Sequence, residues 1–272
     1  MWQVATATAP GTPGAVSEDW HYADRTLLVV LDGATVRTDT GCSHGVHWYA
    51  TQLGEAITTA ARDNQRPLTR VLKDAIEHVA ALHPDCDLAH AGTPSAGVAV
   101  VRAAGDAVEY LVLGDVTAIL DTGQEVRVVA DMRIRHTAVD ARAEADRWPI
   151  GSPEKREALQ RMKLQELAAR NRPDGYWIAA ADPAAAKHAI TGSMPTSDIR
   201  RLLVVTDGVE RLVSLFGAVR DWQQLLKMAD SNGPQALIDT VRELEQQDPE
   251  GRRYPRNKTS DDATAVYAAV ND

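Results

Sequence analysis

The sequence predicts an α+β fold built from antiparallel sheets. Two segments, LLVVLDG at 27–33 and LLVVTDG at 202–208, run an aliphatic stretch into Asp-Gly and share six of seven letters. Four apolar residues in a row, rich in valine, are typical of a strand buried on both faces. Groups of consecutive strands alternate with pairs of long helices along the chain, which favours antiparallel sheets over a strict βαβ relay.

The expected elements follow from apolar periodicity and turn residues. The first half predicts strands at 2–8 and 22–32, helices at 46–62 and 68–82, and strands at 95–101, 108–113, 117–120 and 125–130. The second half predicts a polar helical stretch at 135–170 interrupted by WPIGSP, strands at 176–179 and 199–205, helices at 213–229 and 234–246, and a last strand at 264–270. We expect a single domain over 1–272 with a flap at about 135–172.

Charge and composition exclude several classes of partner. The chain has 272 residues, a net charge of −9 and a pI near 5.4, which argues against nucleic-acid binding. No apolar run approaches the ~18 residues that span a bilayer, and the first residues do not resemble a secretory signal. Two cysteines, Cys42 and Cys86, are too few for a disulfide framework. We therefore expect a cytoplasmic monomer without a membrane or nucleic-acid partner.

Carboxylates recur where apolar strands begin or end. Asp32 and Asp207 end the two related strands, and Asp115 follows the strand YLVLG. Glu18-Asp19 precedes the first buried strand, and Asp261-Asp262 precedes the last. Carboxylates that converge on one edge repel each other unless cations neutralise them. Magnesium and manganese take oxygen ligands, so the set predicts a metal site, whereas each aspartate alone reads as an ordinary turn residue.

The ordered set of these acidic motifs resembles the metal-dependent serine/threonine protein phosphatases of the PPM, or type 2C, family, in a divergent bacterial-type form. The resemblance runs from Glu18 to Val270. It implies a four-layer αββα sandwich, with two antiparallel sheets flanked by helix pairs. It also implies hydrolysis of phosphoserine, phosphothreonine or a related phosphate ester by attack of a metal-bridging water, with a phosphoprotein or a small phosphate ester as substrate.

The same resemblance implies the roles of the site residues. Asp32 bridges two Mn²⁺ or Mg²⁺ ions and the Gly33 carbonyl binds one of them, while Asp207 and Asp261 bind the first ion. The remaining acidic residues hold the second ion through water (Glu18 and Asp19) or help to bind a third ion (Asp115). The catalytic residues in this scheme are Asp32 and Asp207.

Three positions depart from the family pattern. Asp32-Gly33 continues as Ala-Thr-Val instead of x-Gly-Gly, and the last motif is Asp261-Asp262 instead of Asp-Asn. Gly14 stands where the family commonly has the arginine that binds the substrate phosphate. Arg37 is the first candidate to replace that arginine, followed by Arg25 and the basic loop 251–258, with His44 as a further donor.

Other functions compete with this interpretation. A catalytically weak type 2C-like binding or regulatory module that retains metal is the main alternative. Phosphatases that use a nucleophilic aspartate need a second acid two residues later, and position 34 is alanine. The segment Cys42-Ser43-His44-Gly45-Val46-His47 suggests a zinc site, but its spacing matches no established zinc pattern and it lacks a fourth ligand.

Overall fold

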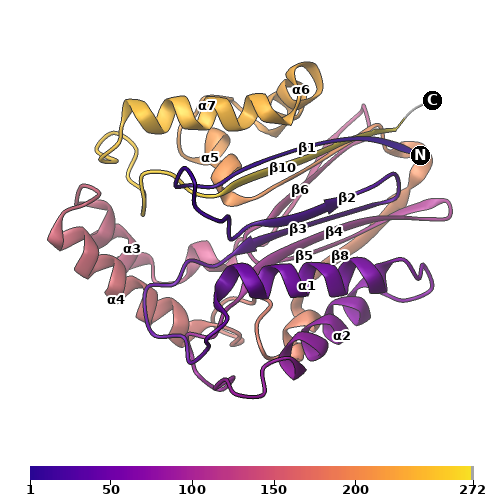
Figure 1. Cartoon of the computed structure of the whole chain (residues 1–272). Coiled ribbons are helices and arrows are strands. Elements are labelled where there is room, and N and C mark those ends of the chain that lie inside the picture. Colours follow the sequence, from indigo (N-terminus) through magenta and orange to yellow (C-terminus); the bar gives the residue numbers. More distant parts are fainter. Residues whose placement is uncertain (271–272) are drawn as a thin grey trace.

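The computed structural model describes residues 1–270. Two five-stranded antiparallel sheets pack face to face between layers of helices, as Figure 1 shows. The strands are β1 (Trp2–Ala9), β2 (Trp20–Ala23), β3 (Leu27–Gly33), β4 (Ala96–Ala104), β5 (Ala107–Leu113), β6 (Thr117–Asp121), β7 (Val126–Ala130), β8 (Ile190–Pro195), β9 (Arg201–Val205) and β10 (Ala263–Val270). The predicted four-layer sandwich is confirmed.

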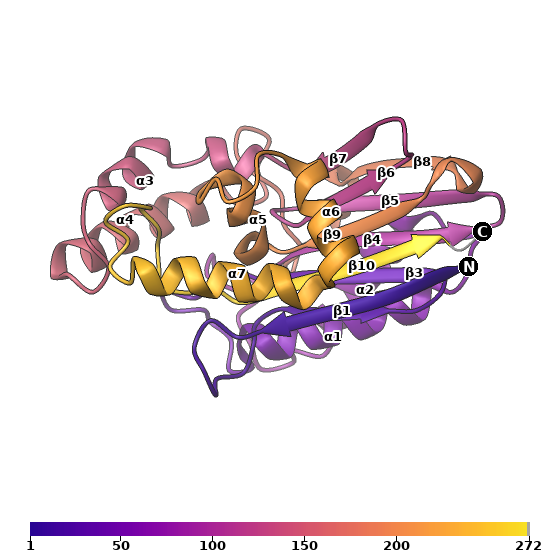
Figure 2. The same ribbon diagram turned by 90° about the horizontal axis from the view of Figure 1, so that it is seen from above.

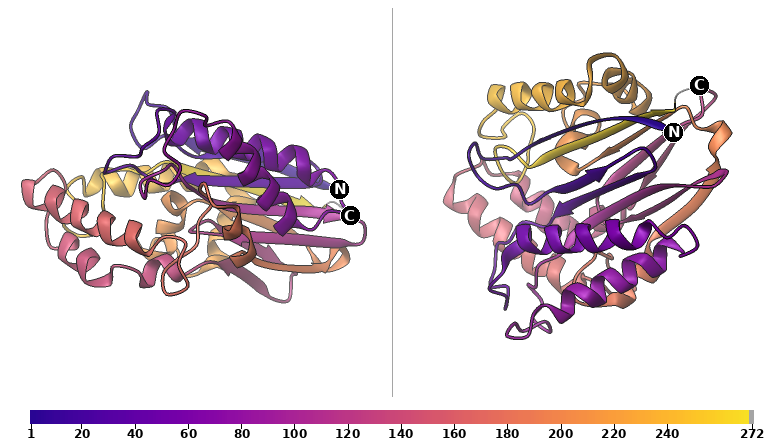
Figure 3. Two further views of the ribbon diagram at one scale, coloured as in Figure 1. Left: turned by 90° about the horizontal axis from the view of Figure 1, so that it is seen from below. Right: turned by 45° about the vertical axis from the view of Figure 1, so that its right-hand side comes forward.

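Helices cover both outer faces of the sandwich. The α-helices are α1 (Gly45–Ala61), α2 (Leu68–Ala81), α3 (Val139–Asp146), α4 (Pro153–Ala169), α5 (Asp207–Ser214), α6 (Trp222–Asn232) and α7 (Pro234–Gln247). Three short 3₁₀ helices are η1 (Arg133–His136), η2 (Pro183–His188) and η3 (Thr196–Asp198). The view from below in Figure 3 shows α1 and α2 over one sheet, and Figure 2 shows α6 and α7 over the other. No helix within residues 1–270 combines the length and the apolar character needed to cross a bilayer.

The two sheets explain the aliphatic runs in the sequence. One sheet has the order β1-β10-β9-β6-β7 and the other has the order β2-β3-β4-β5-β8. In β3, Leu28 and Val30 face the opposite sheet, whereas Leu27, Val29 and Leu31 pack against α1 and α2. Strand β9 divides its side chains in the same way between the other sheet and α5 to α7. Both strands are apolar throughout because each is buried on both faces.

Three local predictions are wrong, and one strand was not expected. The expected strand 22–32 is a β2-β3 hairpin, because Asp24 accepts the backbone N–H groups of Thr26 and Leu27 and turns the chain. The expected helix 213–229 is broken at Gly217, whose φ of +58° ends α5 before α6 begins. Residues 176–179 form only isolated bridges, and the sequence did not predict the largely exposed strand β8.

The α3–α4 hairpin lies beyond one end of the sandwich, opposite the chain termini (Figures 1 and 2). Helix α4 begins where Ser152 accepts the backbone N–H of Lys155 and Pro153 occupies the first turn. Strand β3 runs towards this end in Figure 1, and Asp207, which follows β9, contacts Asp32 near the end of β3. The ends of both strands therefore face the hairpin. The hairpin coincides with the segment that the sequence predicts as a flap.

Candidate active site

A cavity of about 430 Å³ opens at this end of the sandwich. Four of the predicted carboxylates line it, and they come from three strand ends and one loop: Asp32, Asp115, Asp207 and Asp261. Helix α4 contributes Met162, Lys163 and Glu166 to the opposite wall. The turns that follow the strands therefore bring acids that are far apart in sequence to one place.

The two Asp-Gly motifs owe their glycines to close packing. A Cβ on Gly33 would lie 2.4 Å from the carbonyl oxygen of Glu18, and a Cβ on Gly208 would lie 2.0 Å from that of Asp262. Neither glycine has a positive φ, so the sharp turn that Asp-Gly suggests is not the reason for them. Each glycine instead lets the neighbouring acidic motif approach the end of its strand.

Hydrogen bonds of Asp262 and Asp19 fix the close contacts of the acidic motifs with the strand ends. The Asp262 carboxylate accepts the backbone N–H groups of Gly11 and Glu18 at 2.7 and 2.6 Å. Asp19 accepts a hydrogen bond from the hydroxyl of Thr206 at 2.9 Å and is 7% exposed. Glu18 and Asp19 do not line the cavity but lie directly behind it, against Gly33 and Thr206.

The environment of these carboxylates disfavours their ionised forms. Burial raises the pKa of Asp32 well above its ordinary value, and the charges of Asp207, Asp19 and Asp115 raise it further. Burial raises the pKa values of Asp19 and Asp115 in the same direction, and burial together with Asp261 raises the pKa of Asp207 to about 7. Such a set of oxygen donors fits divalent cations, which would neutralise it.

Two protein cations already compensate one of the acids. Arg211 and Lys258 both form ion pairs with Asp261, and Arg211 lies 3.4 Å from Asp207. Although burial acts to raise it, these cations hold the pKa of Asp261 below its ordinary value. No three carboxylates within residues 1–270 have oxygens that all lie within 4.8 Å of one another.

Arg37 and Lys163 bring positive charge to the same cavity. Arg37 is half-buried, and its guanidinium donates to the carbonyl oxygen of Asn257 at 3.3 Å. Lys163 is half-buried on α4. Burial lowers the pKa of both groups. In the part of the chain that the structure describes, neither forms an ion pair, so both are available for an anion.

Of the other candidates for the missing arginine, only the basic loop 251–258 reaches the cavity. Gly14 has a φ of +80° and does not line the cavity, and Arg25 lies in the β2–β3 turn at the far end of β3. In the basic loop, Arg256 and Lys258 line the cavity. His44 is exposed and does not line the cavity, because its ring lies against Cys42 and Cys86.

Sequence reasoning missed two site residues. Lys163 belongs to a helix whose polar residues show no clear face, so nothing in its pattern marked it. Arg211 stands four residues after Asp207, and this spacing on one helix face was the available signal.

The sequence matches the family described as protein phosphatase 2C over residues 14–242. The chain belongs to this family. Its members are metal-dependent phosphoric monoester hydrolases, and the fold and the acidic cavity agree with that assignment. The search of curated proteins found no match.

Solved phosphatase structures of the 2C type share the whole fold. The Mycobacterium tuberculosis serine/threonine phosphatase PstP has a TM-score of 0.62 at 16% identity, and the match covers 100% of this chain and 99% of that one. A PstP catalytic domain in complex with two manganese ions has a TM-score of 0.56 at 18% identity, covering 100% and 99%. Stp1 from Staphylococcus aureus has a TM-score of 0.58 at 14% identity, covering 100% and 96%.

Proposed function

We propose that this 2C-family chain hydrolyses phosphoserine, phosphothreonine or a related phosphate ester with two Mn²⁺ or Mg²⁺ ions. The observation that carries the proposal is the composition of one cavity, in which a group of carboxylates faces Arg37 and Lys163. The carboxylates suit divalent ions, and the two unpaired cations suit a phosphate dianion. A site with only one of these features would bind either a metal or an anion.

The acidic residues would share the ions as follows. Asp32 would hold both ions, the Gly33 carbonyl and the carboxylates of Asp207 and Asp261 would hold the first, and Glu18 and Asp19 would hold the second through water. Asp115, half-buried beside Asp207, would help to bind a third. When bound, such ions acidify water and neutralise charge on a phosphoryl group.

The chain's own residues position the substrate. The Arg37 guanidinium presents several N–H donors, so it can hold two phosphate oxygens at once, and Lys163 adds a point charge. The α3–α4 hairpin forms the wall that carries Lys163 and Glu166 and would limit access of water to the cavity. We propose that it is the flap of a single domain. We also propose that the protein is a monomer in the cytoplasm. The two free thiols agree with a reducing compartment.

The test is hydrolysis of a phosphothreonine peptide and of p-nitrophenyl phosphate with added Mn²⁺ or Mg²⁺. Wild type should show turnover that saturates with metal. Asp207→Asn should lose roughly two or more powers of ten in kcat, because metal catalysis supplies several kcal/mol. Asp106→Asn, in the exposed turn after β4, should match wild type. Metal binding without turnover of either substrate would contradict the proposal.

One observation favours a second candidate, a regulatory module with little or no catalysis. Arg211 and Lys258 occupy oxygens of Asp261, and Arg211 also contacts Asp207, so protein cations compete with the first ion. If these pairs persist when metal is present, ion affinity is low and hydrolysis is slow. Calorimetric titration of wild type with Mn²⁺ distinguishes the candidates, since an active site requires binding at metal concentrations that support turnover.

A further inference from the structure

Two loops contact each other beside the acidic cavity, and only the first of them contributes residues to its wall. The loop 34–44 connects β3 to α1, and the loop 82–95 connects α2 to β4. The backbone N–H of Asp87 donates to the carbonyl oxygen of Gly41 at 2.9 Å, and a Cβ on Gly92 would lie 2.1 Å from the carbonyl oxygen of Asp39. This contact brings together Cys42 and Cys86, the two cysteines of the chain.

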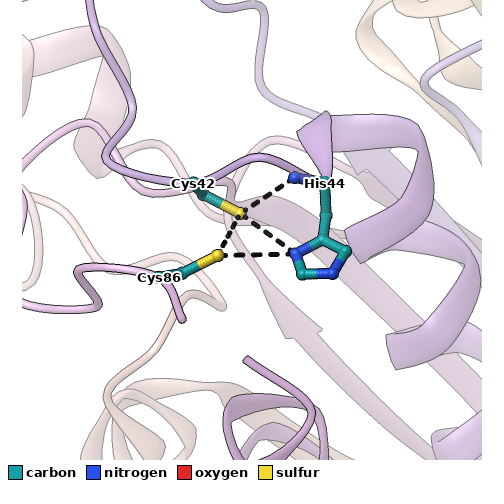
Figure 4. A group of neighbouring side chains, drawn as sticks. All are labelled: Cys42, His44 and Cys86. Atoms are coloured by element: carbon teal, nitrogen blue, oxygen red, sulfur yellow. Dashed lines mark hydrogen bonds between the residues drawn. The ribbon is translucent and has the colours of Figure 1, made fainter. Parts of the chain in front are cut away.

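The side chains of Cys42, His44 and Cys86 form a compact triangle, which Figure 4 shows. The two Sγ atoms are 3.6 Å apart, and His44 Nδ1 lies 3.7 Å from Cys42 Sγ and 3.5 Å from Cys86 Sγ. A tetrahedral zinc ion with ordinary bond lengths sets sulfur–sulfur edges of about 3.8 Å and sulfur–nitrogen edges of about 3.6 Å. All three edges of the triangle therefore have the dimensions of a tetrahedral metal site, and both thiols are free.

His83 supplies a second, independent observation. The residue is 5% exposed, and its ring centroid lies 4.9 Å from that of the His44 ring. Its Nδ1 contacts the carbonyl oxygen of Val79 at 2.8 Å, and because a carbonyl can only accept, Nδ1 carries the proton. Nε2 is then a lone-pair acceptor, and it is buried without a partner. A metal-binding histidine usually donates its other ring N–H to such an oxygen.

We propose that Cys42, His44 and Cys86 bind one ion of the zinc class, with His83 Nε2 as the fourth ligand. The ligands then read Cys-x-His in the first loop and His-x-x-Cys in the second. His83 lies outside the 4.8 Å group of the other three, so ligation moves it towards the sulfurs. Each thiol releases its proton to solvent when the ion binds.

The chemistry of the ligands separates this ion from those of the acidic cavity. Thiolate and imidazole select zinc-like ions, whereas carboxylates and water suit magnesium and manganese. The loop 34–44 starts directly after Gly33 and contains Arg37, which lines the cavity. An ion bound to Cys42 would therefore restrict the motion of the loop that positions the Arg37 guanidinium. The ion is structural, and the inference does not depend on phosphatase activity.

The test uses the full chain and a spectroscopic readout. Cobalt should bind with thiolate-to-metal charge-transfer bands and the visible bands of tetrahedral coordination, and zinc should displace it at one equivalent. In wild type, saturating zinc should protect both thiols from a thiol reagent, and a chelator should restore their reactivity. Equal labelling rates with and without zinc, or a disulfide between the two cysteines in protein purified without reductant, would overturn the proposal.

Variants assign the individual ligands. Cys86→Ser and His44→Gln should each weaken zinc binding by more than about 100-fold, which exceeds the usual effect of altering an outer partner. His83→Gln should also weaken it by at least about tenfold, and unchanged affinity would remove His83 from the site. His78→Gln, on the exposed face of α2, is the matched control and should leave affinity unchanged. Asp32→Asn should keep the charge-transfer bands, which separates this site from the acidic one.

Discussion

The backbone N–H of Asp207 donates a hydrogen bond to Oδ2 of Asp32 at 3.1 Å. The two residues end the two related aliphatic segments, which belong to different sheets. Asp207 is also the first residue of α5, so Asp32 faces a helix N-terminus, where partial positive charge favours a carboxylate. The repeated sequence therefore marks a meeting point at which two acids, one from each sheet, are held in contact.

The first prediction concerns the repulsion among the acids. Asp32→Asn should stabilise the ion-free protein at neutral pH, because it removes a charge whose pKa is raised by burial and then by the neighbouring carboxylates. The melting temperature should rise by at least about 2 °C, the effect of roughly 1 kcal/mol in a chain of this size. The variant should lose most of the stabilisation that Mn²⁺ gives wild type. Calorimetry with and without Mn²⁺ measures both effects, and an equal Mn²⁺ response in the two proteins would contradict the assignment of Asp32.

The second prediction concerns Arg37. Arg37→Ala should raise KM for a phosphopeptide by roughly 10- to 100-fold, because a hydrogen bond to a charged group contributes about 1.5–3 kcal/mol. Lys163→Ala should act in the same direction, and kcat should change less than KM in both variants. The control is Arg25→Ala, which removes an exposed guanidinium from the far end of β3. Steady-state kinetics at saturating metal measure both constants. An unchanged KM in the double variant would contradict the proposal that Arg37 and Lys163 bind the substrate phosphate.

The third prediction concerns Arg211, which pairs with Asp207 and Asp261. Arg211→Met should lower the free energy of unfolding of the ion-free protein by about 1.5–3 kcal/mol, because Asp207 loses its ion-pair partner and Asp261 keeps only Lys258. Added Mn²⁺ should recover much of this loss and should bind more tightly than to wild type, since the competing cation is gone. Denaturant unfolding with and without Mn²⁺ measures the difference.

A matched control for Arg211 is available at Arg62, which directly follows α1. Arg62→Met removes a guanidinium that is 60% exposed and 3.9 Å from Asp24, and surface pairs contribute at most about 1 kcal/mol. If Arg211→Met destabilises the protein no more than Arg62→Met, the arginine does not neutralise the acidic centre.

The fourth prediction concerns the loop that carries Lys258. Asp248 accepts the backbone N–H groups of Arg252, Arg253 and Tyr254 at 2.9, 3.2 and 2.9 Å. Burial acts to raise its pKa, but these N–H groups and Arg256 hold the pKa of Asp248 below its ordinary value. A carboxylate whose pKa is lower in the folded than in the unfolded protein stabilises the fold at pH values above its unfolded pKa, about 3.9 for aspartate. This stabilisation is lost as the pH falls through the pKa of the folded protein.

Asp248→Ala should therefore be less stable than wild type at pH 7, by about 1.5–3 kcal/mol if one charged hydrogen bond is lost in net terms. The difference should shrink as the pH falls below about 4, where the wild-type carboxylate becomes protonated. Urea unfolding at several pH values tests this, with Asp174→Asn as an exposed control. A difference that does not depend on pH would show that the carboxylate's charge is not what orders the loop.

Periodicity and turn residues were sufficient for the layers of this fold. An apolar run such as 27–31 has to be buried on both faces, and helices such as α1 and α2 show their buried face every three to four residues. These signals are local, because they depend on residues a few positions apart. Where a turn was set by one side chain, as at Asp24, or by a single positive φ, as at Gly217, the same signals predicted one long element instead of two.

The contents of the cavity depend on approaches between distant residues. Asp32 meets Asp207 across 175 positions, Arg211 meets Asp261 across 50, and Cys42 meets Cys86 across 44. The acids themselves were recognisable because each stands at a strand end. The pairing of Arg211 with Asp261, the lysine that α4 presents and the approach of Cys86 to Cys42 and His44 were not predicted, because a charge or a thiol acquires its partner only when packing of the layers brings two loops or helices together. Burial of apolar side chains leaves a pattern along the chain, whereas the distance between two polar groups exists only in three dimensions.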